Sequence, residues 1–200
     1  MVTGSYHLAD NPDLYEFARS NVFEFVVTGL NKDFKGNTYD LIRAGYQGTE
    51  SNAKIDAAIA EESIRISVEE SSVPHFTQAV LEVRRGNSVM KAAGVPTFEA
   101  GSIILNDYVG ADTKSMLMAW QNLSYDVATE KVGRMSKYKK LCYLMEYTQD
   151  FELIRTWELK GCWISGLSTG NFNQGQGDKR NITATIQYDS AKMLMPEEEE

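Results

Sequence analysis

The chain has 200 residues, of which 42% are hydrophobic and 24% are charged, which suits one globular domain with a buried core. Its net charge is −8, and it is still −4 (−8 + 4) without Glu197–Glu200, which belong to an expected acidic tail at residues 195–200. This negative net charge argues against a protein that binds nucleic acid through its phosphates. No stretch approaches the roughly 18–20 apolar residues of a membrane-spanning helix. The first residues lack the pattern of a secretion signal, so we expect synthesis in the cytoplasm.

The amino-terminal part of the chain contains one strong strand signal and one long connection. Asn21–Gly29 is rich in Phe and Val and predicts the first strand. Residues 30–60 are expected to form an extended loop, because Gly and Asn recur between Leu30 and Asn52, and Lys54–Glu62 predicts a short helical turn at its end. Four aromatic and aliphatic residues make this loop a candidate contact segment: Tyr39, Leu41, Ile42 and Tyr46.

The middle of the chain alternates apolar and polar residues. Ile64–Glu69 has this period of two and predicts a half-buried strand with its three aliphatic residues on one face. Ala79–Val83 predicts another strand, which leads into a turn at Arg85–Ser88. Phe98–Tyr108 predicts a further strand, bulged at Gly101.

One helix and three more strands complete the expected fold. Asp112 or Thr113 can cap a helix that runs to about Leu123, with Trp120 on its apolar face. It is followed by a polar connection over residues 126–138. Strands are predicted at residues 141–147, 153–166 and 181–189, and the last has Ile182, Ala184, Ile186 and Tyr188 facing inward.

These elements lack a repeating βαβ order, which disfavours a doubly wound nucleotide-binding sheet. We therefore expect a mainly β protein, an antiparallel β-sandwich or barrel with one flanking α-helix and a long inserted loop. Residues 1–200 are expected to form a single domain.

No pattern of residues indicates catalysis or metal binding. The GxSxG, GxxxxGK[ST] and HExxH motifs are absent from the sequence. Glu69 and its neighbour Glu70 would face opposite sides of a strand and could not flank one substrate. Cys142 and Cys162 lie in apolar segments, which is typical of buried thiols in a cytoplasmic protein. We expect neither an enzyme nor a bound cofactor or metal.

Several short motifs occur in a fixed order. Arg155–Ile164 places a basic residue and a tryptophan before a Leu-x-Gly step, and Ile182–Asp189 closes a strand on tyrosine. The predicted helix carries Trp120-Gln121, and Glu69–Pro74 ends a strand in small residues and a proline. This set, from about residue 64 to 193, resembles the tail tube proteins of contractile-tailed bacteriophages. The residues that carry the family motif are Trp120, Trp157, Leu159, Gly161 and Tyr188.

The resemblance implies a structural protein of the virion tail, assembled in the host cytoplasm. It implies hexameric rings that stack into a tube, with the sheets of neighbouring subunits joined into an inner β-barrel and the loop at residues 30–60 reaching the next ring. The implied partners are the tail sheath, tape measure, baseplate and tail terminator proteins, with no membrane. Double-stranded DNA would pass through the lumen without specific binding. Five candidate acidic residues of the lumen are Glu69, Glu82, Glu146, Glu152 and Glu158.

Two other readings remain open. The inner tube of a secretion system or of an extracellular contractile injection system would share this fold. A small ligand-binding β-barrel would also explain the alternating strands and the aromatic residues Tyr143, Trp157 and Trp163. That reading expects a monomer that binds an apolar ligand.

Overall fold

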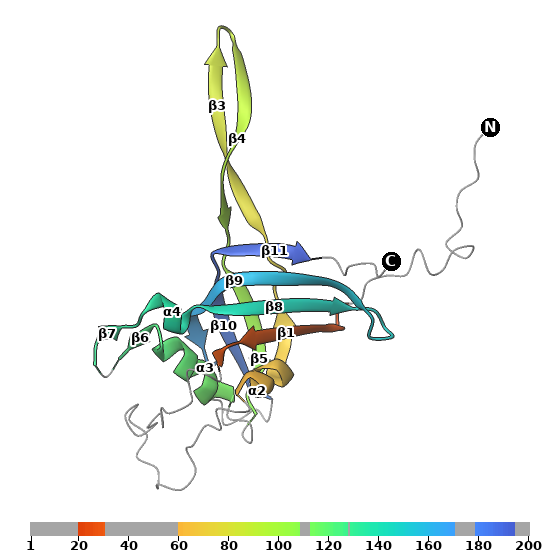
Figure 1. Cartoon of the computed structure of the whole chain (residues 1–200), viewed down its shortest axis with the longest axis vertical. Coiled ribbons are helices and arrows are strands. Elements are labelled where there is room, and N and C mark those ends of the chain that lie inside the picture. Colours follow the sequence, from red (N-terminus) through yellow and green to blue (C-terminus); the bar gives the residue numbers. More distant parts are fainter. Residues whose placement is uncertain (1–19, 31–59, 109–112, 128, 171–178, 195–200) are drawn as a thin grey trace, which may run out of the picture.

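The computed structural model describes residues 20–30, 60–108, 113–127, 129–170 and 179–194. These residues form a body of strands and short helices, from which one long two-stranded hairpin projects (Figure 1). All strand pairings in the described part of the chain are antiparallel. The predicted mainly β, antiparallel fold is therefore confirmed. The long inserted loop at residues 30–60 falls almost entirely outside the described residues.

The body is built around two sheets that share one long strand. The first sheet has the order β1–β8–β9–β11 and the second has the order β9–β10–β5–β2. Their bounds are β1 (Phe23–Thr28), β2 (Val68–Ser71), β5 (Gly101–Asn106), β8 (Lys140–Tyr147), β9 (Leu153–Ser168), β10 (Asn181–Gln187) and β11 (Ser190–Leu194). The predicted strands at 21–29, 141–147, 153–166 and 181–189 correspond to β1, β8, β9 and β10 and are confirmed.

Strand β9 passes from one sheet to the other at Gly161. Residues before Cys162 pair with β8 and β11, whereas residues after it pair with β10. Gly161 has a φ of +72°, and a Cβ at this position would overlap the carboxylate of Asp189. That carboxylate accepts hydrogen bonds from Nζ of Lys139, which lies 2.8 Å from both of its oxygens. Glycine adopts this φ without strain and, having no Cβ, leaves room for the carboxylate of Asp189.

We expect Gly161→Ala to lower the free energy of unfolding by about 2–3 kcal/mol. The methyl group adds backbone strain at positive φ, which costs roughly 1–2 kcal/mol, and it displaces Asp189 from Lys139. Urea unfolding of the purified protein measures the loss. Gly29→Ala is the matched control, since Gly29 has a φ of +84° and a methyl group there would meet no other part of the structure within 4 Å. It should lose only the strain, and equal losses for the two variants would contradict the role given to Asp189.

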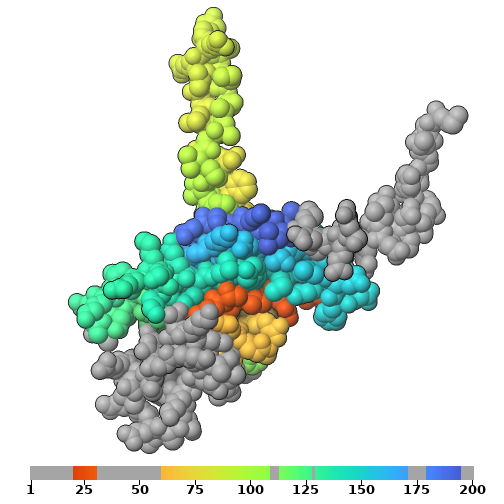
Figure 2. Space-filling model, in the orientation of Figure 1, coloured from red at the N-terminus to blue at the C-terminus, as the bar shows by residue number. Residues whose placement is uncertain are grey.

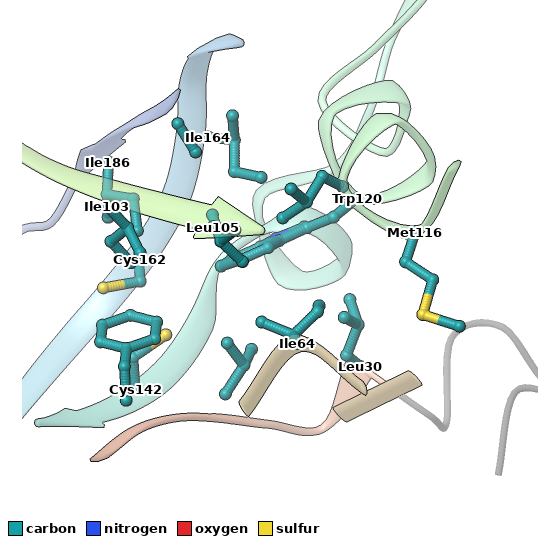
Figure 3. Packing of buried hydrophobic residues seen from close by; sticks show 14 of the residues in the cluster. Leu30, Ile64, Ile103, Leu105, Met116, Trp120, Cys142, Cys162, Ile164 and Ile186 are labelled. Carbon is teal, nitrogen blue, oxygen red and sulfur yellow. The ribbon is translucent and has the colours of Figure 1, made fainter. Parts of the chain in front are cut away.

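The core lies between the sheets and is closed by two helices. In β10, Ile182, Ala184 and Ile186 are all buried, and Tyr188 follows them at the strand end, as the alternation predicted. Helix α3 (Thr113–Asn122) matches the predicted helix and inserts Trp120 into the core, where Figure 3 shows it between Leu105, Ile164 and Ile64.

Residues 60–67 are a helix, α2 (Ala60–Ser67), so the strand predicted at Ile64–Glu69 is wrong over most of its length. Ile64 is buried, whereas Ile66 is 63% exposed, which rules out a common face for these two residues. The buried residues of α2 follow the helical spacing i, i+3, i+4, i+7, and they are Ala60, Ser63, Ile64 and Ser67. Only the final part of the predicted strand survives, as β2.

Two further predictions need correction. The strand expected at Phe98–Tyr108 is interrupted, because β4 ends at Phe98 and β5 begins at Gly101, so Gly101 starts a strand and is not a bulge within one. The described residues also contain more than the one expected helix. The connection at 126–138 includes β6 (Tyr125–Asp126), β7 (Lys131–Val132) and the short helix α4 (Met135–Tyr138).

Candidate assembly surfaces

The hairpin of β3 (Phe76–Arg85) and β4 (Ser88–Phe98) stands away from the body (Figures 1 and 2). Every residue of β3 is exposed, and so are most residues of β4. The exposed large hydrophobic residues of the hairpin are Phe76, Val80, Leu81, Val83, Val89, Met90 and Val95. Such a concentration of apolar side chains on a protein surface is typical of sites that contact another protein, a membrane or a ligand.

The two faces of the hairpin differ in character. Residues directly opposite each other share a face, and Val83 lies opposite Met90 and next to the pair formed by Leu81 and Ala92. This face is apolar at these two pairs. The other face is mixed, because Glu82 lies opposite Lys91 with their charged atoms 3.8 Å apart, and the neighbouring pairs on that face include Val80 and Val89. Neither face of the hairpin is covered within the described part of the chain.

Aromatic rings fix the base of the hairpin to the body. The ring centroids of Phe76 and Phe98 are 5.7 Å apart, and those of Phe98 and Tyr188 are 6.0 Å apart. The hydroxyl of Thr77 also donates a hydrogen bond of 2.9 Å to Glu99. Tyr188 is one of the residues of the expected family motif, and here it joins the end of β10 to the hairpin. The hairpin is thus held at its base and projects along the rest of its length.

Strand edges form a second kind of candidate surface. Strands β1 and β2 stand at the two ends of the strand order, and β11 pairs only with β9 in the described residues. An unpaired edge offers N–H and C=O groups to a strand of another chain. Three such edges on one body favour assembly in which a strand of another chain pairs with one of these edge strands.

The outer face of the second sheet is uncharged and mostly polar along β5 and β10. The outward-facing residues are Ser102, Ile104, Asn106, Asn181, Thr183, Thr185 and Gln187. The outer face of the first sheet differs, because it carries Glu158 beside Lys160, with 3.4 Å between their charged atoms. The uncharged face could line a channel without holding a charged polymer in place.

The five acidic candidates lie on five different segments. Glu69 is in β2, Glu82 in β3, Glu146 in β8, Glu152 in the β8–β9 turn and Glu158 in β9. Four of them form ion pairs within the chain: Glu69 with Lys179, Glu82 with Lys91, Glu146 with Arg155 and Glu158 with Lys160. The structure does not gather them on one surface, and their place in a lumen stays a prediction.

The residues of the expected family motif have structural roles. Trp120 is 1% exposed and donates a hydrogen bond of 3.0 Å to the carbonyl oxygen of Tyr138. Trp157 packs against the core and donates to a carboxylate oxygen of Glu146 at 3.1 Å, and Leu159 is buried. The contact candidates Tyr39, Leu41, Ile42 and Tyr46 and the acidic tail lie outside the described residues.

The described residues offer little support for a chemical site. They contain no group of three or more His, Cys, Asp or Glu side chains placed to hold a metal ion. Cys142 and Cys162 are free and buried, and burial raises the pKa of the Cys142 thiol, which disfavours a reactive thiolate. Among the same residues, no helix has the length and apolar character needed to cross a membrane.

The aromatic residues expected of a ligand-binding barrel do not converge. Tyr143 lies on the outer face of the first sheet, since its neighbours Cys142 and Leu144 are the buried ones. Trp163 packs edge-on against Tyr138, with 5.7 Å between ring centroids, and Trp157 lies on the core side. These residues therefore form no common ligand cavity.

One conspicuous residue has almost no signal in the sequence. Phe151, in the turn between β8 and β9, is 78% exposed and has a φ of +64°. Its only sequence signal is an aromatic residue between two acidic ones, in the short connection between the strands predicted at 141–147 and 153–166. The β3–β4 turn was predictable, but nothing in its sequence indicates that the hairpin leaves the body.

No protein-family model and no curated protein sequence matches this chain. Its fold, however, is similar to several chains of contractile injection systems. One is a chain of the sheath–tube complex of an extracellular contractile injection system, PVC, in its extended state, with a TM-score of 0.62, 16% identity and coverage of 96% of this chain and 99% of that one. Another is a chain of the PVC sheath/tube terminator, with a TM-score of 0.59, 17% identity and coverage of 90% and 99%.

A third similar chain belongs to the tube-terminating cap of the anti-feeding prophage, AFP. It has a TM-score of 0.57 and 13% identity, and the match covers 96% of this chain and 99% of that one. The likeness extends over nearly the whole of each chain, so it concerns the complete fold. The tail-tube-like fold that the sequence motifs predicted is therefore confirmed.

Proposed function

We propose that this chain is the tube subunit of a contractile apparatus, in which copies close into rings and the rings stack into a hollow tube. The observation that carries this proposal is the β3–β4 hairpin, which exposes seven large hydrophobic residues on a body that is otherwise packed like a tube protein. The proposal makes residues 1–200 one structural domain without enzymatic activity.

The hairpin needs a partner for physical reasons. A two-stranded ribbon without a third strand or a helix against it is at best marginally stable in water. An apolar ribbon that packs on a neighbouring subunit gains the missing contact and removes its hydrophobic side chains from water. A second copy of the same chain supplies such a partner in every position of a repeating tube.

The open edges of the body support ring formation. Pairing of β1, β2 or β11 with a neighbouring copy would remove exposed edges that otherwise invite uncontrolled aggregation. Contacts between two different surfaces of identical copies produce closed rings or open filaments, according to the rotation between copies. Six copies to a ring, and a contact between residues 30–60 and the next ring, are the finer form of this proposal.

The apparatus itself has two candidate forms. In a bacteriophage tail the tube would convey double-stranded DNA, with the sheath, tape measure, baseplate and terminator proteins as partners. In an extracellular contractile injection system the tube would convey another cargo, and the similar chains from PVC and AFP favour this second form. Genes for a capsid and a terminase next to the gene for this chain would identify the first form.

The lumen is expected to be non-adhesive in either form. The net charge of −8 and the uncharged outer face of β5 and β10 both suit a surface along which a polyanion slides. The acidic candidates Glu69, Glu82, Glu146, Glu152 and Glu158 would add repulsion only where their own ion pairs leave a net negative charge.

We expect the purified wild-type protein to form rings or tubes at high concentration. Six domains of this size around a hole wide enough for a DNA duplex give an outer width of roughly 80–100 Å. Negative-stain microscopy and a sizing column provide the measurement. A species that remains monomeric at every concentration, and does not polymerise on a preformed tube end, would contradict the proposed function.

A further inference from the structure

Two surfaces of opposite charge lie at the two ends of β8. Before this strand lies the basic segment, residues 125–139, which contains β6, β7 and α4. After it lies the acidic turn, residues 148–153, which leads into β9. Eight residues of strand separate them by roughly 25 Å, at about 3.3 Å per residue. Figure 1 shows them on opposite sides of the body, and the hairpin points away from the body in a direction roughly perpendicular to β8.

The acidic turn presents an aromatic ring between two carboxylates. Asp150, Phe151 and Glu152 are all exposed. The turn is well formed, since the amide of Thr148 donates to the carbonyl oxygen of Glu152 at 2.8 Å and the amide of Phe151 donates to that of Thr148 at 3.1 Å. Its geometry places Phe151 at a φ of +64°, where glycine or asparagine is favoured and a bulky residue is strained. A strained residue that also exposes its ring points to a function in binding.

The basic segment has matching properties. Its exposed apolar residues are Tyr125, Val127, Val132 and Met135, with exposed fractions from 47% to 78%. It carries four cations and two carboxylates, but Lys139 is paired with Asp189 of the body, so the balance that it offers to another copy is +1 (3 − 2), whereas the acidic turn carries two carboxylates and no cation, a balance of −2. The segment is tied to the body, because the indole N–H of Trp120 donates to the carbonyl oxygen of Tyr138 at 3.0 Å. It therefore forms a defined apolar and basic surface.

We propose that the acidic turn of one copy docks on the basic segment of the next copy, and that this contact closes the ring. Phe151 would pack among Val127, Val132 and Met135, while Asp150 and Glu152 face Lys131 and Arg134. The inference rests on the proposed tube function and specifies which surfaces meet within a ring. A contact between two acidic turns is disfavoured by charge repulsion, so the union is head to tail, as a ring requires. The hairpin, which points in another direction, is left for contact between rings.

Charge reversal at each end tests this contact. One variant carries Asp150→Lys and Glu152→Lys, and the other carries Lys131→Glu and Arg134→Glu. Each alone is expected to raise the protein concentration needed for rings by about tenfold or more, because like charges then face each other. Sedimentation velocity measures that concentration. The matched control, Asp150→Glu with Glu152→Asp, keeps both charges and should assemble as the wild type does.

Mixing the two variants in equal amounts gives the sharper result. Copies with two basic ends and copies with two acidic ends complement each other only in strict alternation, so rings with an even number of subunits should reappear. Rings from each variant alone at the wild-type concentration would overturn the proposed contact while leaving the tube function intact. If the wild-type protein never forms rings, the tube function and this contact both fail.

Phe151→Gly separates folding from docking. Glycine adopts the φ of +64° without strain, so the melting temperature of the unassembled variant should equal or exceed that of the wild type. Ring formation should nevertheless require about tenfold more protein, because the aromatic side chain that docks is gone. Unchanged assembly of this variant would exclude Phe151 from the contact.

Discussion

Val83→Asp combined with Met90→Asp is expected to abolish tube assembly while leaving the body folded. The two residues lie opposite each other on the apolar face of the hairpin and are 49% and 56% exposed, so the free chain tolerates carboxylates there. Once a neighbouring copy covers this face, each unpaired carboxylate costs several kcal/mol. Two such charges exceed the free energy that a subunit contact of ordinary strength supplies. Pelleting of tubes and microscopy should show none, whereas circular dichroism should show an unchanged fold.

The opposite face of the hairpin provides the control. Glu82→Gln combined with Lys91→Gln removes an exposed ion pair, which contributes at most about 1 kcal/mol. This variant should assemble at close to the wild-type concentration if the apolar face is the one that docks. Tubes from the double aspartate variant in wild-type yield would show that the apolar face stays exposed in the assembly.

Trp120→Ala is expected to lower the free energy of unfolding by about 3–5 kcal/mol, the largest loss that we expect from a single substitution. The indole is 1% exposed, and its removal leaves a large cavity among Ile64, Leu105 and Ile164. It also leaves the carbonyl oxygen of Tyr138 without the hydrogen bond that the indole N–H donates. Domains of this kind are stable by only about 5–15 kcal/mol, so the loss should be obvious in urea unfolding.

Trp163→Ala is the matched control for that experiment. Trp163 is half-buried and its ring packs against Tyr138 on the outer side of β9, so less apolar surface is lost and no core cavity forms. We expect a loss of roughly 1–2 kcal/mol. A smaller loss for the substitution at position 120 than for the one at 163 would contradict the central place of Trp120 in the core.

The elements that pack on the core of the chain are predictable from the spacing of their apolar residues. The strict alternation of Ile182, Ala184 and Ile186 is diagnostic of a strand with one face on a core, and the structure confirms it. The helix at Thr113–Asn122 is predictable because its apolar residues recur at helical spacing. The strand predicted at Ile64–Glu69 is wrong over most of its length, because the buried face of α2 is partly made of Ala and Ser, which a search for large apolar residues does not count. The exposed Ile66 lies two residues from both Ile64 and Val68, which gives the sequence the period of two that is typical of a strand.

The candidate assembly surfaces are much harder to predict from the sequence. Leu81 and Val83 have the pattern of buried residues, yet they are exposed in the single chain, because hydrophobic pattern records burial without saying which molecule provides it. The strained backbone of Phe151 has no local sequence signal at all. The ion pairs of the acidic candidates depend on cations from the same or adjoining strands and, for Glu69, on Lys179 over a hundred positions away.

If the chain forms tubes as proposed, the projecting hairpin also has a consequence for the time course of polymerisation. When two free copies meet, each has to order its own ribbon, and every residue that becomes fixed costs roughly 1–2 kcal/mol of chain entropy. A copy that arrives at the end of a growing tube meets ribbons that are already held. Starting a tube is then slow and extending it is fast, which gives a lag that a preformed end removes. In such a system the number of preformed starting ends, and not the supply of subunits, would set the number of tubes.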